Sequence, residues 1–204
     1  MGKFSESVLG LGQDPAPINT LSVNVNLVKF IQMSQKHTYT TADYLPWDTA
    51  TNLVRKLFRN GDYRMSLFIG CGIFFGLRVS DLLTLSWNQI LGGDEFVIYE
   101  KKTDKRRVIR INEGFKAHIA DCYQALGIMD INEPCFLNRY GSVLSLQMIN
   151  RNFKAIKVKY QLKIENFSTH SLRKTWARQV YENENSQGRG DMALLKLSEI
   201  MNHS

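Results

Sequence analysis

The chain has 204 residues, of which 44% are hydrophobic and 11% aromatic, enough to fill the core of one or two globular domains. Its longest nearly unbroken apolar run, residues 67–77, is far shorter than the roughly 20 residues that cross a bilayer. Residues 1–11 also lack the apolar centre of a signal peptide. We therefore expect a soluble, cytoplasmic protein with no membrane association.

The formal net charge of +7 favours binding to polyanions, nucleic acid above all. Two stretches concentrate the cations: six of the ten residues 101–110 are Lys or Arg, and Glu165 is the only acid within residues 151–178. Either stretch alone could equally be a solvated helix face or a soluble hairpin tip.

The three cysteines are widely spaced and form no CxxC pair, which predicts reduced thiols and no metal site. No GxxxxGK[ST] loop is present, so we expect no nucleotide cofactor.

Residues 1–44 mix Gly, Pro, Ser and Asn with short apolar stretches and are predicted to be a linker or N-terminal extension, with the compact domain at 45–204. From Pro46 the apolar spacing is helical, and Asn60-Gly61 supplies the stop. A second helix is expected at about 63–75, ended by Gly76. Ser80-Asp81 can cap a third helix, which places Arg78 in a tight junction between two buried helices.

Residues 95–99 and 107–111 alternate apolar and polar side chains and predict a β-hairpin with a cationic tip. The remaining patterns predict helices at about 113–125, 145–161, 170–183 and 191–201, with a loop at 183–190. The sum is an α+β domain, mainly α-helical, with one small antiparallel sheet.

Four segments carry motifs in a recognisable order. Residues 76–83 read Gly-Leu-Arg-Val-Ser-Asp-Leu-Leu, residues 100–105 read Glu-Lys-Lys-Thr-Asp-Lys, residues 169–177 read Thr-His-Ser-Leu-Arg-Lys-Thr-Trp-Ala, and residues 197–204 read Leu-Ser-Glu-Ile-Met-Asn-His-Ser. Together they resemble the catalytic domain of the tyrosine recombinases, the phage integrase family, from about residue 41 to the last residue. Asn202 stands where the family usually has Gly, and Trp176 where it often has Phe; both substitutions suit the same local geometry.

The resemblance implies a site-specific recombinase with a small sheet of about three strands, which breaks and rejoins double-stranded DNA through a 3′-phosphotyrosine link. It implies that Arg78 and Arg173 hold the phosphate, since two rigid, forked guanidiniums suit the charge that develops on its oxygens. His170 and His203 would add donors or align the reacting groups, and Lys102 would protonate the leaving 5′ oxygen.

Two parts of this assignment stay open. Lys101 and Lys105 compete with Lys102 for the role of general acid, because the hairpin register decides which amine reaches the site. Asp81 either orients Arg78 through a salt bridge or caps a helix. The cations expected to contact DNA are Lys101, Lys105, Arg106, Arg107, Arg151, Lys154, Lys157 and Lys174.

In the family the nucleophilic tyrosine follows the histidine of the last of these motifs, whereas this sequence ends one residue after that histidine, His203. We therefore expect the polypeptide alone to bind a phosphate without cleaving it, either as a fragment of a longer gene product or as an inactive remnant. The family works as a homotetramer on DNA, and this chain is expected to be a monomer.

Two other functions remain possible at this stage: a non-catalytic DNA-binding remnant or regulator, and a helical interaction protein with structural arginines. Both DNA-binding hypotheses require an affinity that falls steeply with salt, unlike the third. The target site, and the choice among integration, excision, inversion and dimer resolution, are not specified by the sequence.

Overall fold

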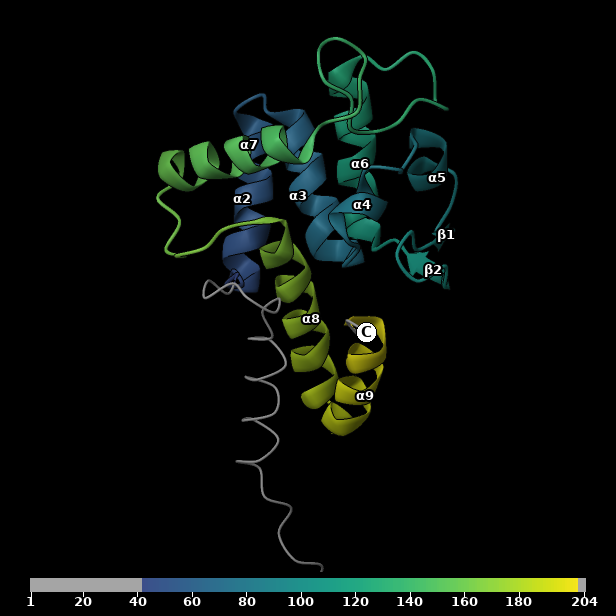
Figure 1. Cartoon of the computed structure of the whole chain (residues 1–204), viewed down its shortest axis with the longest axis vertical. Helices are drawn as coiled ribbons and strands as arrows, with labels where there is room; N and C mark the ends of the chain where they lie inside the picture. Colours follow the sequence, from purple (N-terminus) through teal and green to yellow (C-terminus); the bar gives the residue numbers. More distant parts are fainter. Residues whose placement is uncertain (1–41, 202–204) are drawn as a thin grey trace, which may run out of the picture.

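The computed structural model describes residues 42–201. Most of the predicted extension 1–44 and the candidate His203 therefore lie outside the described residues, and the expected boundary at residue 45 stays a prediction. Within the described part the chain forms helices and one hairpin, arranged as in Figure 1. In chain order the elements are α2 (Trp47–Arg59), α3 (Tyr63–Phe75), α4 (Val79–Leu82), α5 (Trp87–Leu91), β1 (Glu95–Tyr99), β2 (Arg106–Arg110), α6 (Glu113–Leu126), α7 (Leu146–Lys159), α8 (Thr169–Asn185) and α9 (Gly190–Met201).

Helix α3 lies at the centre and packs against α2, α6 and α8. It is apolar on nearly all sides, which explains why almost all of its side chains are buried. Two of its glycines permit close approach: a Cβ at Gly70 would overlap the Phe115 ring on α6, and one at Gly72 would overlap Leu172 on α8. This close packing holds α8, which carries the motif of residues 169–177, against α3.

The helix predictions for α2 and α3 are confirmed, including their ends. Asn60 and Gly61 close α2, and Gly76 ends α3 in the left-handed conformation with φ of 60°. The third helix differs from the prediction: α4 begins directly after Arg78 rather than at the Ser80-Asp81 cap, and it is only four residues long.

Helix α5 was not predicted, since five residues are too few to show a helical period. Its start is marked by a capping box in which Ser86 and Gln89 exchange hydrogen bonds with each other's backbone. This short helix turns the chain from α4 towards the hairpin.

The predicted hairpin is confirmed as an antiparallel pair in which Glu95 lies opposite Arg110 and Tyr99 opposite Arg106. Within residues 42–201 the sheet holds two strands rather than about three. The buried faces of the strands carry Phe96, Ile98 and Ile109. Since side chains alternate along a strand, residue 100 continues the inward-facing set of β1.

The later helices agree with the predicted ranges to within two residues, and α8 continues to Asn185, two residues into the predicted loop. Asn112 and Ser145 cap α6 and α7 with their side chains, which accounts for the start of each helix. The hydrophobic interior has two parts: a main core around α3, and a smaller cluster of Ala177, Tyr181, Ala193 and Leu197 between α8 and α9.

The three cysteines are buried and unbonded to one another. Burial raises the pKa of Cys122 to about 12, so its thiol stays protonated and unreactive at neutral pH. No helix among residues 42–201 is long and apolar enough to cross a membrane.

His118 on α6 contributes a pH-dependent stability. Its Nε2 lies 3.0 Å from the Ser66 hydroxyl, and burial lowers its pKa, an effect that Asp121 opposes. Because the pKa of His118 in the folded state lies below the unfolded value of about 6.5, the unfolded chain binds the proton more readily. The free energy of unfolding is therefore greatest above that pH and falls as the pH drops below it. Between pH 7.5 and 5.5, the free energy of unfolding in urea should fall further for the wild type than for His118→Gln. Equal falls in the two proteins would contradict this assignment.

Candidate phosphate-binding site

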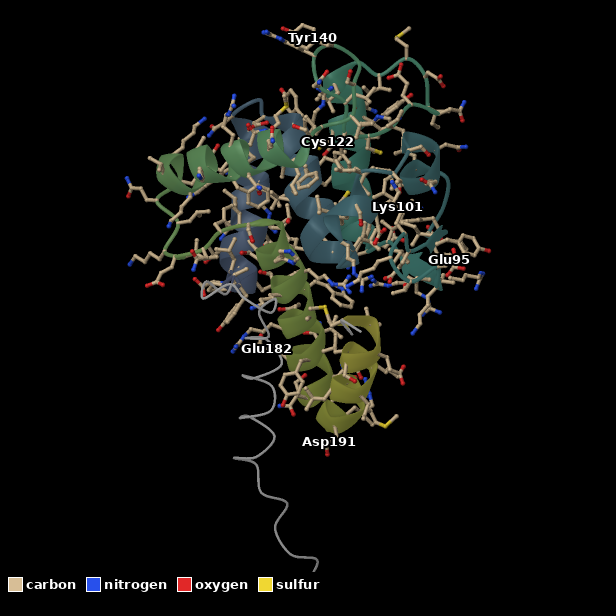
Figure 2. All side chains as sticks on the ribbon, viewed as in Figure 1. Glu95, Lys101, Cys122, Tyr140, Glu182 and Asp191 are labelled. Atoms are coloured by element: carbon tan, nitrogen blue, oxygen red, sulfur yellow. The ribbon has the colours of Figure 1, made fainter. Side chains whose placement is uncertain are left out.

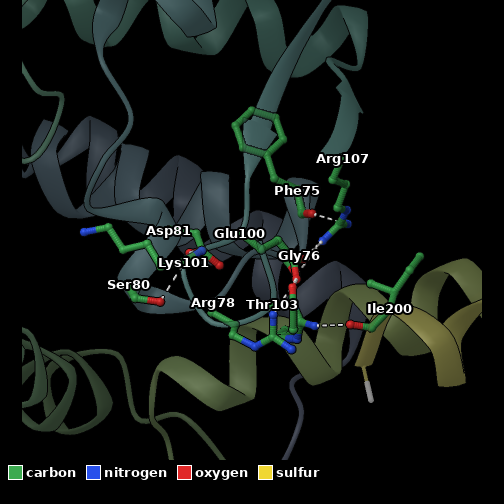
Figure 3. A network of polar contacts seen from close by, with 11 residues as sticks. Phe75, Gly76, Arg78, Ser80, Asp81, Glu100, Lys101, Thr103, Arg107 and Ile200 are labelled. Carbon is green, nitrogen blue, oxygen red and sulfur yellow. Dashed lines mark hydrogen bonds and ion pairs between the residues drawn. The ribbon is translucent and has the colours of Figure 1, made fainter. Parts of the chain in front are cut away.

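The junction between α3 and α4 places Arg78 beside the turn end of the hairpin (Figure 3). Gly76 turns the chain by its left-handed conformation, and Arg78 then takes an extended conformation as the residue that precedes α4. The Arg78 side chain is 12% exposed, and its Nη1 donates to Oε2 of Glu100 at 2.5 Å. This charge-assisted bond fixes the guanidinium at the surface of the junction.

Arg173 reaches the same junction from α8. Its Nη1 donates to the carbonyl of Gly76, and its Nη2 donates to the carbonyl of Ile200 at 2.7 Å. Burial, together with the positive charges of Arg78 and Arg107, lowers the pKa of Arg173 to about 10, although the charges of Glu100 and Asp81 oppose this shift. The guanidinium thus remains protonated at neutral pH and ties α3, α8 and α9 together.

Arg107 of β2 also turns into this site, although the sequence placed it among exposed DNA contacts. Its Nη2 donates to the Phe75 carbonyl at 2.9 Å, and its Nη1 lies 3.5 Å from Oε1 of Glu100. The guanidinium lies 5.0 Å from the centre of the Trp176 ring. Figure 2 shows the resulting gathering of nitrogen atoms between the hairpin and α9.

Asp81 lies beside the start of the hairpin turn, and its predicted support of Arg78 stays a prediction. The completely buried carboxylate accepts the backbone N–H of Lys101 at 3.0 Å and the Ser80 hydroxyl at 3.3 Å. Asp81 is the acidic residue in the first turn of α4. Its carboxylate also anchors the start of the hairpin turn against α4.

Glu100 is a further residue of this site, one that the sequence motifs did not single out. Its side chain is only 6% exposed and lies between Arg78 and Arg107. Desolvation raises the pKa of this carboxyl, but the hydrogen bonds from Arg78 and Thr103 and the charges of Arg78 and Arg173 outweigh it, so the pKa is lowered overall. The sequence signal for its inward position is the alternation along β1, because Glu100 continues the inward-facing series of Phe96 and Ile98.

The hairpin lysines are all exposed. Lys102 lies in the turn between β1 and β2, and Figure 3 shows the Lys101 amine directed away from Arg78. Lys105 and Arg106 lie at the start of β2 and are also exposed. The assignment of the general acid to Lys102 therefore stays a prediction.

His170 is exposed near the start of α8, three residues before Arg173, and therefore on the same helix face. Partial desolvation lowers its pKa, as do the charges of Lys174 and Arg173, which favours a neutral imidazole at neutral pH. His203 lies outside the described residues, so its predicted place in the site is untested.

The predicted DNA contacts on α7 and α8 differ in how exposed their side chains are. Arg151 and Lys154 are exposed on α7, whereas Lys157 donates to the Glu165 carbonyl at 2.7 Å. Lys174 is 8% exposed, and its amine donates to the Ala42 carbonyl at 2.7 Å. Lys174 is thus a buried cation held by a backbone carbonyl, and its predicted contact with DNA stays a prediction.

The site is suited to an anion rather than to a metal ion. Three guanidiniums and a lysine-rich turn supply donors, and among residues 42–201 no group of three His, Cys, Asp or Glu side chains could hold a metal ion. Forked guanidinium donors match the oxygens of a carboxylate or a phosphate.

Comparison with known proteins agrees with this geometry. The model of the phage integrase family matches residues 48–203. Over 147 residues the chain is 31% identical to the probable integrase/recombinase YoeC of Bacillus subtilis (strain 168), covering 70% of this chain and 71% of that protein.

Solved structures share the fold. The XerA recombinase matches with a TM-score of 0.58 at 19% identity, covering 84% of this chain and 66% of that one. The lambda integrase catalytic core matches with a TM-score of 0.54 at 20% identity, covering 76% of this chain and 90% of that one. XerH bound to difH in a pre-cleavage complex matches with a TM-score of 0.59 at 17% identity, covering 90% of this chain and 57% of that one.

This chain therefore spans slightly under two thirds of the XerA chain and less of the XerH chain. The mainly helical fold with a small antiparallel sheet is the one expected from the motifs. With a family match over residues 48–203 and a YoeC relative at 31% identity, the chain belongs to the phage integrase family, the tyrosine recombinases.

Proposed function

We propose that this chain is the catalytic domain of a site-specific recombinase that cuts and rejoins double-stranded DNA. The observation that carries the proposal is the meeting of Arg78 and Arg173, distant in sequence, at one junction beside a lysine-rich turn. Convergent guanidiniums are the protein groups best suited to the charge that a phosphodiester develops under attack.

In this proposal a tyrosine hydroxyl attacks the phosphorus atom, the 3′ side of the break stays linked to the tyrosine, and the 5′ oxygen leaves. Arg78 and Arg173 stabilise the non-bridging oxygens. Lys102 protonates the leaving oxygen, and His170 and His203 donate to or align the same phosphate. Because the phosphotyrosine conserves the bond energy, the reaction needs no nucleotide hydrolysis.

Related structures support double-stranded DNA as the partner. XerH is bound to its difH substrate, and lambda integrase residues 75–356 are bound to DNA. We propose that the intact protein acts as a homotetramer on DNA in the cytoplasm of a bacterial or phage-carrying cell.

The proposed cations of α7 provide a first test with the present chain. Lys154→Glu should weaken binding to every duplex sequence alike and reduce the slope of log affinity against log salt by about 1, because phosphate contacts carry no sequence information. Lys56→Glu is the matched control, an exposed lysine on α2 outside the predicted set. Anisotropy titrations of unrelated duplexes at several salt concentrations measure both. Equal effects of the two variants would remove α7 from the DNA interface.

The activity itself is tested with the intact gene product. Binding sites are first selected from a random library of duplexes. A duplex that carries such a site with a nick inside it should trap a covalent protein–DNA complex that resists denaturant. Binding of such sites without any covalent complex would favour the alternative, a non-catalytic DNA-binding remnant or regulator. Little binding at any salt concentration would contradict both.

A further inference from the structure

The most unusual feature of the site is a buried carboxylate at its centre. Glu100 is 5% exposed. Its Oε2 accepts from Arg78 at 2.5 Å and from the Thr103 hydroxyl at 3.0 Å, while its Oε1 faces Arg107 at 3.5 Å. Both oxygens are therefore held by donors, two of which are guanidiniums.

A third guanidinium belongs to the same cluster. Arg173 and Arg107 both direct an Nη1 towards the Gly76 carbonyl, at 3.5 Å in the case of Arg107. The charge of Arg173 contributes to the lowered pKa of Glu100. Three cations this close repel one another at the low dielectric of a buried site, and a single anion among them offsets that repulsion.

Arg107 is held in this position by groups other than Glu100. The Phe75 carbonyl accepts from its Nη2 at 2.9 Å, and the Trp176 ring packs against its guanidinium at 5.0 Å. These contacts come from α3 and α8, the elements that also position Arg78 and Arg173. Arg107 would thus keep its place if another anion replaced the carboxylate.

We propose that Arg107 is a third guanidinium of the phosphate site, and that the Glu100 carboxylate occupies this site until a DNA phosphate replaces it. The identity of the incoming anion rests on the proposed function. A carboxylate and the non-bridging oxygens of a phosphodiester present similar pairs of acceptors to forked donors, so one can substitute for the other.

The exchange also involves the lysine turn. The Glu100 carbonyl accepts the N–H groups of Thr103 and Asp104, and its side chain accepts the Thr103 hydroxyl. Lys102 lies within this turn. Displacement of the carboxylate removes the side-chain bond to Thr103, which frees the turn to bring an amine towards the phosphate.

The first test removes the internal anion. Glu100→Gln should bind inorganic phosphate about tenfold more tightly than the wild type, because the phosphate no longer competes with a charge-assisted bond. Asp104→Asn is the matched control: it removes one negative charge from the same hairpin, but Asp104 is exposed, and its left-handed φ of 51° suits asparagine. Its phosphate affinity should equal that of the wild type. The readout is the rise of Tm with phosphate at constant ionic strength.

The second test removes the third guanidinium, and its result does not depend on whether Glu100→Gln folds. Arg107→Gln should weaken phosphate binding about tenfold. Arg110→Gln, which removes a cation from an exposed position of the same strand, should leave it unchanged. Duplex DNA of one fixed sequence is titrated in parallel.

The outcomes separate this proposal from the proposed function. A Glu100→Gln protein that is folded and binds phosphate no more tightly than Asp104→Asn, or an Arg107→Gln protein that binds it as well as Arg110→Gln, would overturn the three-guanidinium site. Tighter phosphate binding by Glu100→Gln without any affinity for duplex DNA would support the anion exchange and contradict the recombinase function.

Discussion

Replacing Arg173 with alanine is expected to lower the rate of covalent complex formation by the intact gene product by about a hundredfold to a thousandfold, the effect of removing one donor that stabilises developing negative charge. The same change leaves the buried carbonyls of Gly76 and Ile200 without their donor. Each loss costs about 1–3 kcal/mol of stability, so the variant should also melt at a lower temperature.

Two controls separate the catalytic from the structural effect. Arg178→Ala removes a guanidinium from the same helix that pairs with Glu182 and packs on the Tyr44 ring, and it should leave the rate unchanged. Arg173→Lys keeps the charge but loses the fork that spans two carbonyls, so its rate should stay well below that of the wild type. Rates are compared at a temperature where circular dichroism shows every variant folded. An Arg173→Ala protein that is folded and forms the complex at the wild-type rate would remove Arg173 from the active site.

Gly76→Ala should destabilise the fold by about 2–5 kcal/mol. A left-handed conformation costs a residue with a Cβ about 1–2 kcal/mol, and overpacking adds about 1–3 kcal/mol. Both penalties apply here, because Gly76 has a φ of 60° and its added Cβ would overlap the Trp176 ring. The Gly76 carbonyl is also the acceptor for Arg173, so a shifted junction should disturb the phosphate site.

Gly61→Ala isolates the backbone contribution, since Gly61 has a φ of 78° and its added Cβ would meet nothing within 4 Å. Urea unfolding of the two variants should therefore differ by the cost of the clash with Trp176. Equal losses of stability in Gly76→Ala and Gly61→Ala would show that the Trp176 ring moves aside without cost. The close approach of α8 to the junction would then contribute nothing to stability.

The helices and the hairpin could be predicted because their signals are local. The apolar spacing in α2, the glycine after α3 and the alternation in the two strands all act within a few residues. Helix α5 is too short to show a period, and the start of α4 depended on a junction that local capping rules assigned to the wrong residues.

The motif order identified Arg78 and Arg173 as members of one site, and the structure brings them to the same junction. The partners of these arginines could not be predicted. Glu100 makes an ion pair with Arg78 although Asp81 is nearer to Arg78 in sequence, because the turn end of the hairpin folds against the end of α3.

By itself the sequence determined the fold class, the order of elements apart from α5, the family, and Arg78 and Arg173 as candidate residues, since each depends on periodicity or on a motif within one segment. Only the tertiary structure decided that Arg107 turns inward, that Lys174 is buried and that a carboxylate lies among three guanidiniums. The physical reason is that burial and ion pairing depend on which faces of α3, α8 and the hairpin meet, and no local pattern encodes contacts between segments so far apart in the chain.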